Sequence, residues 1–120
     1  MIYKALVIPA DPNQPLRLVD YDEAAPLGDL IGLEDNNVGI STFTALRFQF
    51  VYDDIGLFRT APVTNRRAML LWAAAVGRDM GQFVQPLVGD YAVLGLNPDN
   101  GETTDVSPMV RTTLDVMGAK

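Results

Sequence analysis

Residues 46–52 read Leu-Arg-Phe-Gln-Phe-Val-Tyr, and their pattern decides the fold class. The large apolar side chains recur at every second position, as Leu46, Phe48, Phe50 and Tyr52. Arg47 and Gln49 lie between them. Because successive side chains of a strand point to opposite faces, this alternation predicts a half-buried β-strand. The chain is therefore expected to fold around a sheet.

A second apolar stretch, residues 2–9, carries apolar side chains at both odd and even positions. A strand that is apolar on both faces is usually covered on both faces, so this stretch is predicted to be a central strand. The turn-forming residues Asp11, Pro12 and Asn13 follow it. Residues 16–21 are predicted to return beside it as a hairpin partner.

Two further hairpins are predicted in the second half of the chain. Residues 53–56, Asp-Asp-Ile-Gly, form a tight-turn sequence, so residues 57–60 are expected to return beside the strand that precedes them. Residues 90–96 and 103–106 are predicted strands. Residues 97–101 join them, and their Asn-Gly pair supplies the positive φ angles that a tight turn requires.

The main helix is predicted over residues 68–76, which are apolar on every side. A helix of this kind is expected to be the most buried element of the fold. Thr64 or Asn65 can cap its start by accepting a backbone hydrogen bond, and Gly77 can end it in the left-handed conformation. Trp72 is interpreted as a core residue.

Two shorter helices are predicted to begin at Pro26 and Pro108, because proline is favoured at the first helical position. Ser107 can cap the second of these, and Gly118 can end it. Together the elements predict an α+β fold in a single compact domain, residues 1–120. Its sheet is expected to be largely antiparallel, with about five or six strands built from hairpins, packed against one buried helix plus one or two shorter helices.

Composition limits the classes of function. The 120 residues match the usual size of one domain. No cysteine is present, which excludes disulfides and thiolate metal sites. The net charge of −6 disfavours nucleic-acid binding, which needs a basic face. The longest apolar run, residues 68–76, is far shorter than the roughly 20 residues of a membrane span. These features predict a soluble cytoplasmic protein without a membrane partner.

The chain is poor in catalytic groups. It contains no histidine, which excludes serine–histidine and cysteine–histidine catalysis and zinc sites with histidine ligands. The paired acids Asp53 and Asp54 could hold magnesium, but aspartate is also expected in a turn because its side chain bonds the local backbone. No phosphate-binding or dinucleotide-binding glycine motif occurs. We therefore predict no catalytic residues, no metal, no cofactor and no enzymatic activity.

One cluster of basic residues forms a candidate ligand site. Its members are Arg59, Asn65, Arg66 and Arg67. Arg66 and Arg67 fall in the first turn of the main helix, where the helix dipole disfavours cations. A bound anion would reverse that effect, because free N–H groups and guanidinium groups would converge on it. Two alternatives remain open: the arginines pair with Asp53 and Asp54, or they contact a partner protein.

Four short blocks resemble a known family. They are residues 2–9 (Ile-Tyr-Lys-Ala-Leu-Val-Ile-Pro), 53–58 (Asp-Asp-Ile-Gly-Leu-Phe), 65–68 (Asn-Arg-Arg-Ala) and 87–95 (Leu-Val-Gly-Asp-Tyr-Ala-Val-Leu-Gly). They resemble the opening strand, acidic turn, helix start and glycine-aspartate strand of domain of unknown function 3846, small proteins of phages, plasmids and actinobacterial genomes. The resemblance carries no established activity. It implies a phage or mobile-element accessory protein working in a bacterial cytoplasm.

These observations leave three hypotheses for function. The first is a non-enzymatic phage or mobile-element accessory protein that binds a host or defence protein. The second is a small-anion or nucleotide-binding module that uses the arginine cluster. The third is a metal-dependent enzyme that uses carboxylates. A broad apolar surface patch would favour the first hypothesis. A bound anion near Asn65 would favour the second hypothesis, and an acidic pocket that holds a cation would favour the third.

Overall fold

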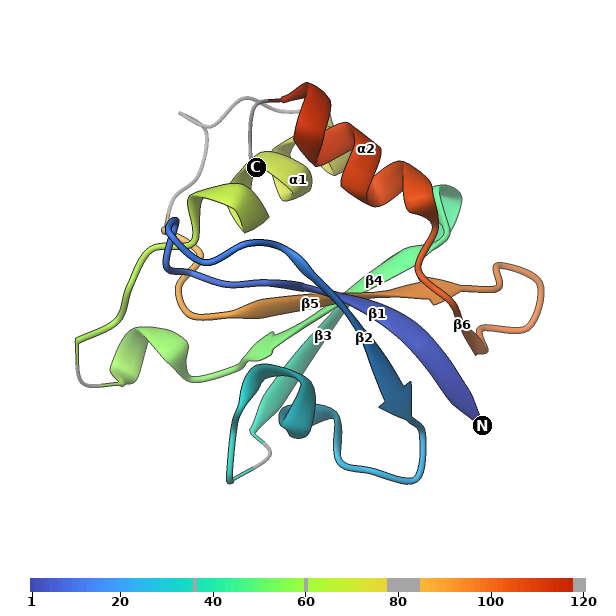
Figure 1. Cartoon of the computed structure of the whole chain (residues 1–120), viewed down its shortest axis with the longest axis horizontal. Coiled ribbons are helices and arrows are strands. Elements are labelled where there is room, and N and C mark those ends of the chain that lie inside the picture. The colour runs from blue at the N-terminus through green and yellow to red at the C-terminus, as the bar shows by residue number, and fades with distance from the viewer. Residues whose placement is uncertain (36, 60, 78–84, 118–120) are drawn as a thin grey trace.

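The computed structural model describes residues 1–35, 37–59, 61–77 and 85–117, and Figure 1 shows the arrangement of their helices and strands. The strands are β1 (Ile2–Ile8), β2 (Arg17–Asp22), β3 (Val38–Phe43), β4 (Phe48–Asp53), β5 (Tyr91–Leu96) and β6 (Thr103–Thr104). The α-helices are α1 (Arg66–Val76) and α2 (Pro108–Val116). Three short 3₁₀ helices are η1 (Leu27–Ile31), η2 (Thr44–Leu46) and η3 (Gly56–Phe58).

The six strands form one antiparallel sheet in the order β2-β1-β5-β4-β3. The short strand β6 pairs with the end of β5. The predicted α+β fold and antiparallel sheet are thus confirmed. The hairpins predicted between residues 2–9 and 16–21 and across residues 97–101 also form, although the second one ends at Thr104 instead of continuing to residue 106.

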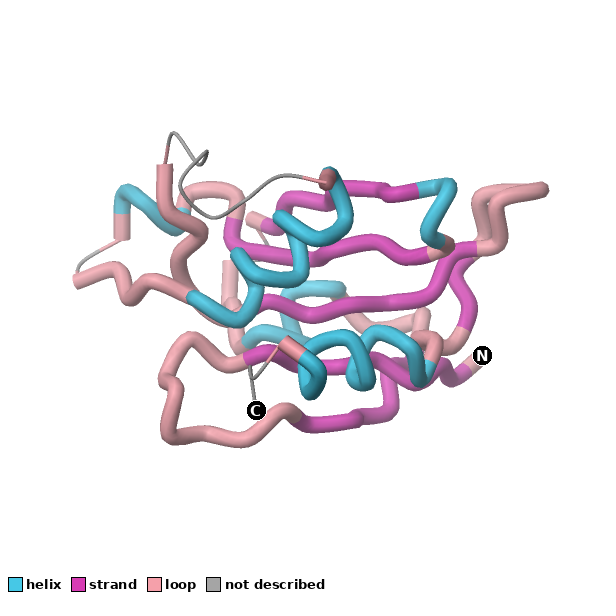
Figure 2. The backbone as a smooth tube through the Cα atoms, turned by 90° about the horizontal axis from the view of Figure 1, so that it is seen from above, coloured by secondary structure: helices cyan, strands magenta, loops and turns pink. Residues whose placement is uncertain are grey.

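The sheet is covered on both faces. Figure 2 shows α1 and α2 lying across one face, and Figure 1 shows η1 on the opposite side. The central strands accordingly carry buried side chains on both faces: every residue of β5 is buried, as are Ala5 to Ile8 of β1. The prediction that residues 2–9 form a central strand is therefore confirmed.

Aromatic side chains fill the core beneath the helices. Trp72 of α1 stacks on Phe50 of β4, with ring centroids 5.0 Å apart, and meets Phe43 of β3 edge to face, with ring centroids 5.3 Å apart. Offset-stacked and edge-to-face pairs add stability beyond the area that they bury. Trp72 thus packs on the core, as the sequence predicts.

Two predictions about strands are wrong. Residues 57–60 do not return beside β4: Leu57 and Phe58 lie in η3, and Thr60 lies outside the described residues. The hairpin partner of β4 is instead β3, a strand that the sequence pattern does not predict. Leu46 also does not belong to β4, because it lies in the η2 turn with its side chain exposed.

Two predictions about helices also need correction. Helix α1 is not the most buried element, because Ala74 and Val76 face solvent whereas all six residues of β5 are buried. Helix α2 begins at Pro108 and is capped by Ser107 as predicted, but it ends at Val116. Gly118, the predicted end, lies outside the described residues. No helix in the described part of the chain is long and apolar enough to cross a membrane.

Candidate functional site

Asn65 is completely buried, and its side chain joins three segments of the chain. Its Oδ1 accepts a hydrogen bond from the backbone N–H of Ala68 at 3.0 Å, which caps α1 as predicted. Its Nδ2 donates to the carbonyl oxygens of Ile8, at 2.8 Å, and Gly89, at 2.9 Å. Both hydrogens of the amide are thus used inside the protein, and Asn65 offers none to a ligand.

Arg67 is also buried, with 6% of its surface exposed. Its Nη2 donates to the backbone carbonyl oxygens of Pro9, at 2.7 Å, and Asp11, at 3.0 Å. The guanidinium group therefore crosses from α1 to the segment after β1, where carbonyl dipoles accept its hydrogen bonds. We call Asn65 and Arg67 with these partners the Asn65–Arg67 network. Arg66, its neighbour, is exposed.

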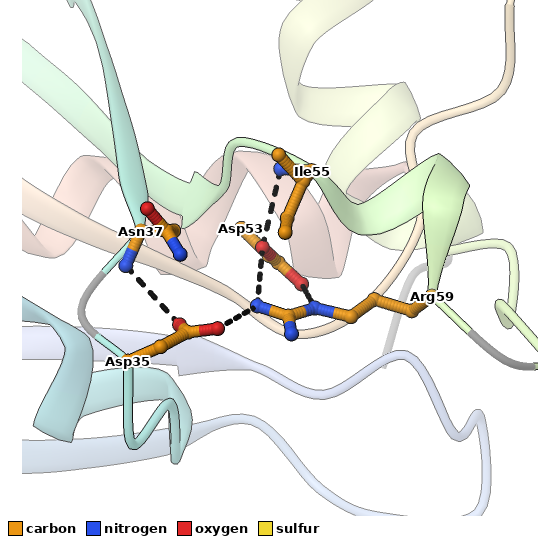
Figure 3. A network of polar contacts seen from close by, with 5 residues as sticks. All are labelled: Asp35, Asn37, Asp53, Ile55 and Arg59. Carbon is orange, nitrogen blue, oxygen red and sulfur yellow. Dashed lines mark hydrogen bonds and ion pairs between the residues drawn. The ribbon is translucent and has the colours of Figure 1, made fainter.

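Arg59 belongs to a second network, which Figure 3 shows. Its Nε and Nη2 donate to the two carboxylate oxygens of Asp53, at 2.8 and 3.2 Å. Its Nη2 also donates to Asp35, at 2.8 Å. We call these three residues the Arg59 network. The pairing of Arg59 with Asp53 is one of the alternatives that the sequence leaves open, whereas the sequence does not predict the contact with Asp35. The carboxylate of Asp54 takes no part in this network.

Two carboxylates balance the charge of Arg59. The hydrogen bond from Arg59 lowers the pKa of Asp35, so that this acid keeps its negative charge. A hollow of about 520 Å³ adjoins the network, and it is lined also by Glu34 and Asp90. With these further acids the surroundings of Arg59 favour cationic groups over anions. The four candidate residues thus have separate roles: Asn65 and Arg67 bind backbone carbonyls inside the fold, Arg59 is paired with two carboxylates, and Arg66 is exposed.

The Arg59 network fixes the turn that follows β4. Asp53 accepts a hydrogen bond from the backbone N–H of Ile55, at 3.2 Å. The backbone N–H of Phe58 donates to the carbonyl oxygen of Ile55, at 2.9 Å. The backbone N–H of Arg59 donates to the carbonyl oxygen of Gly56, at 3.2 Å. A Cβ on Gly56 would lie 3.0 Å from the side chain of Val88, so the turn also packs closely on the fold.

This fixed turn displays apolar side chains to solvent. Phe58 is 87% exposed, and Ile55 and Leu57 are more than one third exposed. We call residues 54–59 the Phe58 loop; in Figure 1 it is the green segment with η3, outside the sheet beyond β4. The sequence pattern does not reveal this loop as a site, because it predicts a strand over residues 57–60. The signal was three large apolar residues, Ile55, Leu57 and Phe58, in a segment that begins with two turn-forming aspartates.

No cluster of three acidic residues in the described part of the chain is arranged to hold a metal ion. Comparison of the chain with models of protein families, with curated proteins and with solved structures finds no match in any of the three. The resemblance to domain of unknown function 3846 therefore stays a prediction.

Proposed function

We propose that the protein is a non-enzymatic binding protein whose Phe58 loop docks into an apolar pocket of another protein. The observation that carries the proposal is the 87% exposure of Phe58 within a hydrogen-bonded turn. Aromatic residues seated in pockets supply much of the energy of protein interfaces. A loop already held in one conformation also loses less entropy on binding than a flexible one.

The charges around the loop indicate the chemistry of the partner. Asp54 is an exposed acid of the loop itself, and Glu34 and Asp90 lie by the adjoining hollow. Arg59, the basic residue of the loop, is already paired with Asp35 and Asp53. A partner with basic residues around an apolar pocket would complement this surface, and opposite charges at the rim of an interface speed association.

The family resemblance supplies the biological setting of the proposal. A phage or mobile-element protein that is poor in catalytic groups can act by binding a host or defence protein in the bacterial cytoplasm. The Phe58 loop gives this role a defined surface. A partner should therefore be sought in a bacterial lysate.

The test is photo-crosslinking from position 58. Phe58 is replaced by a photoreactive phenylalanine analogue, and the protein is irradiated in bacterial lysate. We expect one dominant crosslinked protein, and the crosslink should map to an apolar pocket with neighbouring lysine or arginine residues. The same analogue placed at Met109, an exposed apolar residue of α2, serves as the matched control and should not give this product.

A competition experiment completes the test. Unlabelled wild-type protein should suppress the crosslink, whereas the Phe58→Ser variant should not, although it should melt like the wild type because the side chain is mostly outside the fold. The product should also weaken as salt is added, because salt screens charges at the rim. Equal suppression by the wild type and by Phe58→Ser, or no specific product, would exclude the Phe58 loop as the binding site.

A further inference from the structure

β3 is an edge strand, and among the described residues no strand pairs with its outer side. On its inner side β3 pairs with β4. The carbonyl oxygen of Asn37, just before β3, accepts a hydrogen bond from the backbone N–H of Asp54 at 2.9 Å. Hydrogen-bonded positions alternate along an antiparallel pair, so residues 39, 41 and 43 direct their backbone groups toward β4. Residues 38, 40 and 42 direct theirs outward. Within the described part of the chain, these outward groups form no backbone hydrogen bond to another segment.

The residues of this edge do not protect it from pairing. Natural edge strands commonly carry charges or proline, which prevent the addition of another strand. β3 reads Val-Gly-Ile-Ser-Thr-Phe, without a charge or a proline. At its middle, Ile40 is 49% exposed. The opposite edge strand, β2, carries Arg17, Asp20 and Asp22 within its six residues.

The charges at the two ends of β3 favour a second copy of the chain as the occupant. Residues 38–52 contain a single charged residue, Arg47, at the turn between β3 and β4. Glu34, an exposed acid, and Asp35, which already pairs with Arg59, lie just before the other end of β3. If two copies pair in antiparallel orientation, the Arg47 end of one lies along the acidic end of the other. Parallel pairing would instead place like charges side by side.

We propose that two copies of the chain join along β3 in antiparallel orientation and form one continuous sheet. Because the outward backbone groups belong to residues 38, 40 and 42, even-numbered residues must face one another across the junction. In the register that pairs all three of these residues, the two-fold axis passes between the two copies of Ile40. Val38 of each copy pairs with Thr42 of the other. The proposal does not depend on the function of the Phe58 loop, because it uses the open edge of β3 and not the apolar turn.

The test measures the mass of the protein in solution by sedimentation equilibrium. Wild-type protein should change from its monomer mass of 13.1 kDa to twice that mass as its concentration rises toward millimolar. Ile40→Lys should weaken dimerisation by about tenfold or more, because it places like charges directly opposite each other. Leu18→Lys, a substitution of an exposed apolar residue on the β2 edge, is the matched control and should leave dimerisation unchanged.

A charge-pairing experiment tests the register. Ile40→Lys and Ile40→Glu should each be largely monomeric, and an equimolar mixture should recover the dimer mass because opposite charges then face each other at the axis. Thermal melting of each variant verifies that it is folded, as expected for a half-exposed position. A wild-type protein that stays monomeric at millimolar concentration, or an Ile40→Lys variant that dimerises as tightly as the wild type, would overturn the proposal. So would a mixture that stays monomeric.

Discussion

The Asn65–Arg67 network and the Arg59 network both contain an arginine, and they lie in different surroundings. In the Asn65–Arg67 network the side chains are buried and bind backbone carbonyls of Ile8, Pro9, Asp11 and Gly89. In the Arg59 network the guanidinium group is partly exposed and binds two carboxylates. Eight positions of sequence separate the two arginines, yet their roles differ.

The difference teaches that burial decides the role of a polar cluster. A buried backbone carbonyl that loses its hydrogen-bond donor cannot form a hydrogen bond to water instead. The loss of the donor therefore destabilises the whole fold. An exposed ion pair exchanges readily with water and salt, so its loss changes the global stability little. The Asn65–Arg67 network therefore holds the fold together, and the Arg59 network orders one loop.

The largest effect is expected for Asn65→Ala. It leaves the carbonyls of Ile8 and Gly89 without their amide donor and removes the cap of α1, so it should lower the free energy of unfolding by roughly 3–5 kcal/mol. Urea denaturation followed by tryptophan fluorescence measures the change. Asn65→Ser keeps a capping oxygen, so it should lower the free energy of unfolding by less than Asn65→Ala does. A loss below about 1 kcal/mol for Asn65→Ala would show that water replaces the amide.

A smaller loss is expected for Arg67→Ala. The carbonyls of Pro9 and Asp11 lose their donor and the buried stem of the side chain leaves a gap, which should cost about 2–3 kcal/mol in the same measurement. The double variant Arg66→Ala with Arg67→Ala should behave like Arg67→Ala alone. If the double variant were as stable as the wild type, the hydrogen bonds of Arg67 would not contribute to the fold.

Arg59→Ala should act locally. We expect the melting temperature to fall only slightly, while the amides of Phe58 and Arg59, or of the residue replacing it, exchange with solvent deuterium faster than in the wild type. Hydrogen exchange resolved by residue measures this, with the helix α2 amides as an internal reference. Faster exchange throughout the sheet would contradict a role limited to the loop.

Acid should reproduce the same local effect in the wild type. Because the pKa of Asp35 is lowered in the folded protein, its pair with Arg59 stabilises the loop above the ordinary pKa of 3.8. That contribution is lost as the pH falls through the lowered pKa. Loop exchange, corrected for its intrinsic pH dependence, should therefore rise below about pH 4 in the wild type. Arg59→Ala should not show this rise, and a rise of equal size in the variant would point to another group.

The smallest effect is expected for Arg66→Ala. Arg66 is exposed in the first turn of α1, where the helix dipole disfavours a cation. Its removal should change the free energy of unfolding by less than about 0.5 kcal/mol, with stability unchanged or slightly raised. A clear loss would mean that Arg66 also holds part of the fold, and the contrast between buried and exposed arginines would then fail.

Local patterns in the sequence predicted most of the fold. The alternation of residues 46–52, the apolar stretch 2–9 and the proline and serine that begin α2 each act within a few residues. The sequence does not predict β3, because the pattern of this strand depends on its neighbour β4. The ring of Tyr52 lies where a side chain on residue 39 would be, and Gly39 leaves room for that ring. No pattern within the strand shows that requirement.

The site was less predictable, for a related reason. The pairing of Arg59 with Asp53 spans six positions and was among the alternatives. Asp35 joins the network only because the unpredicted strand β3 places it beside the end of β4. The carbonyl partners of Arg67 come from a segment more than fifty positions earlier, and every residue has a carbonyl, so no residue type marks them.

The position of β1 also determines when the protein can fold during synthesis. β1 and β2 leave the ribosome before the other strands of the sheet and can form their hairpin at once. The other side of β1 must wait for β5 and for Asp105, whose carboxylate accepts a hydrogen bond from the backbone N–H of Lys4 across 101 positions of sequence. Until then the nascent chain exposes an open apolar strand. Contacts this distant slow folding and lengthen the time in which chaperones or aggregation can compete.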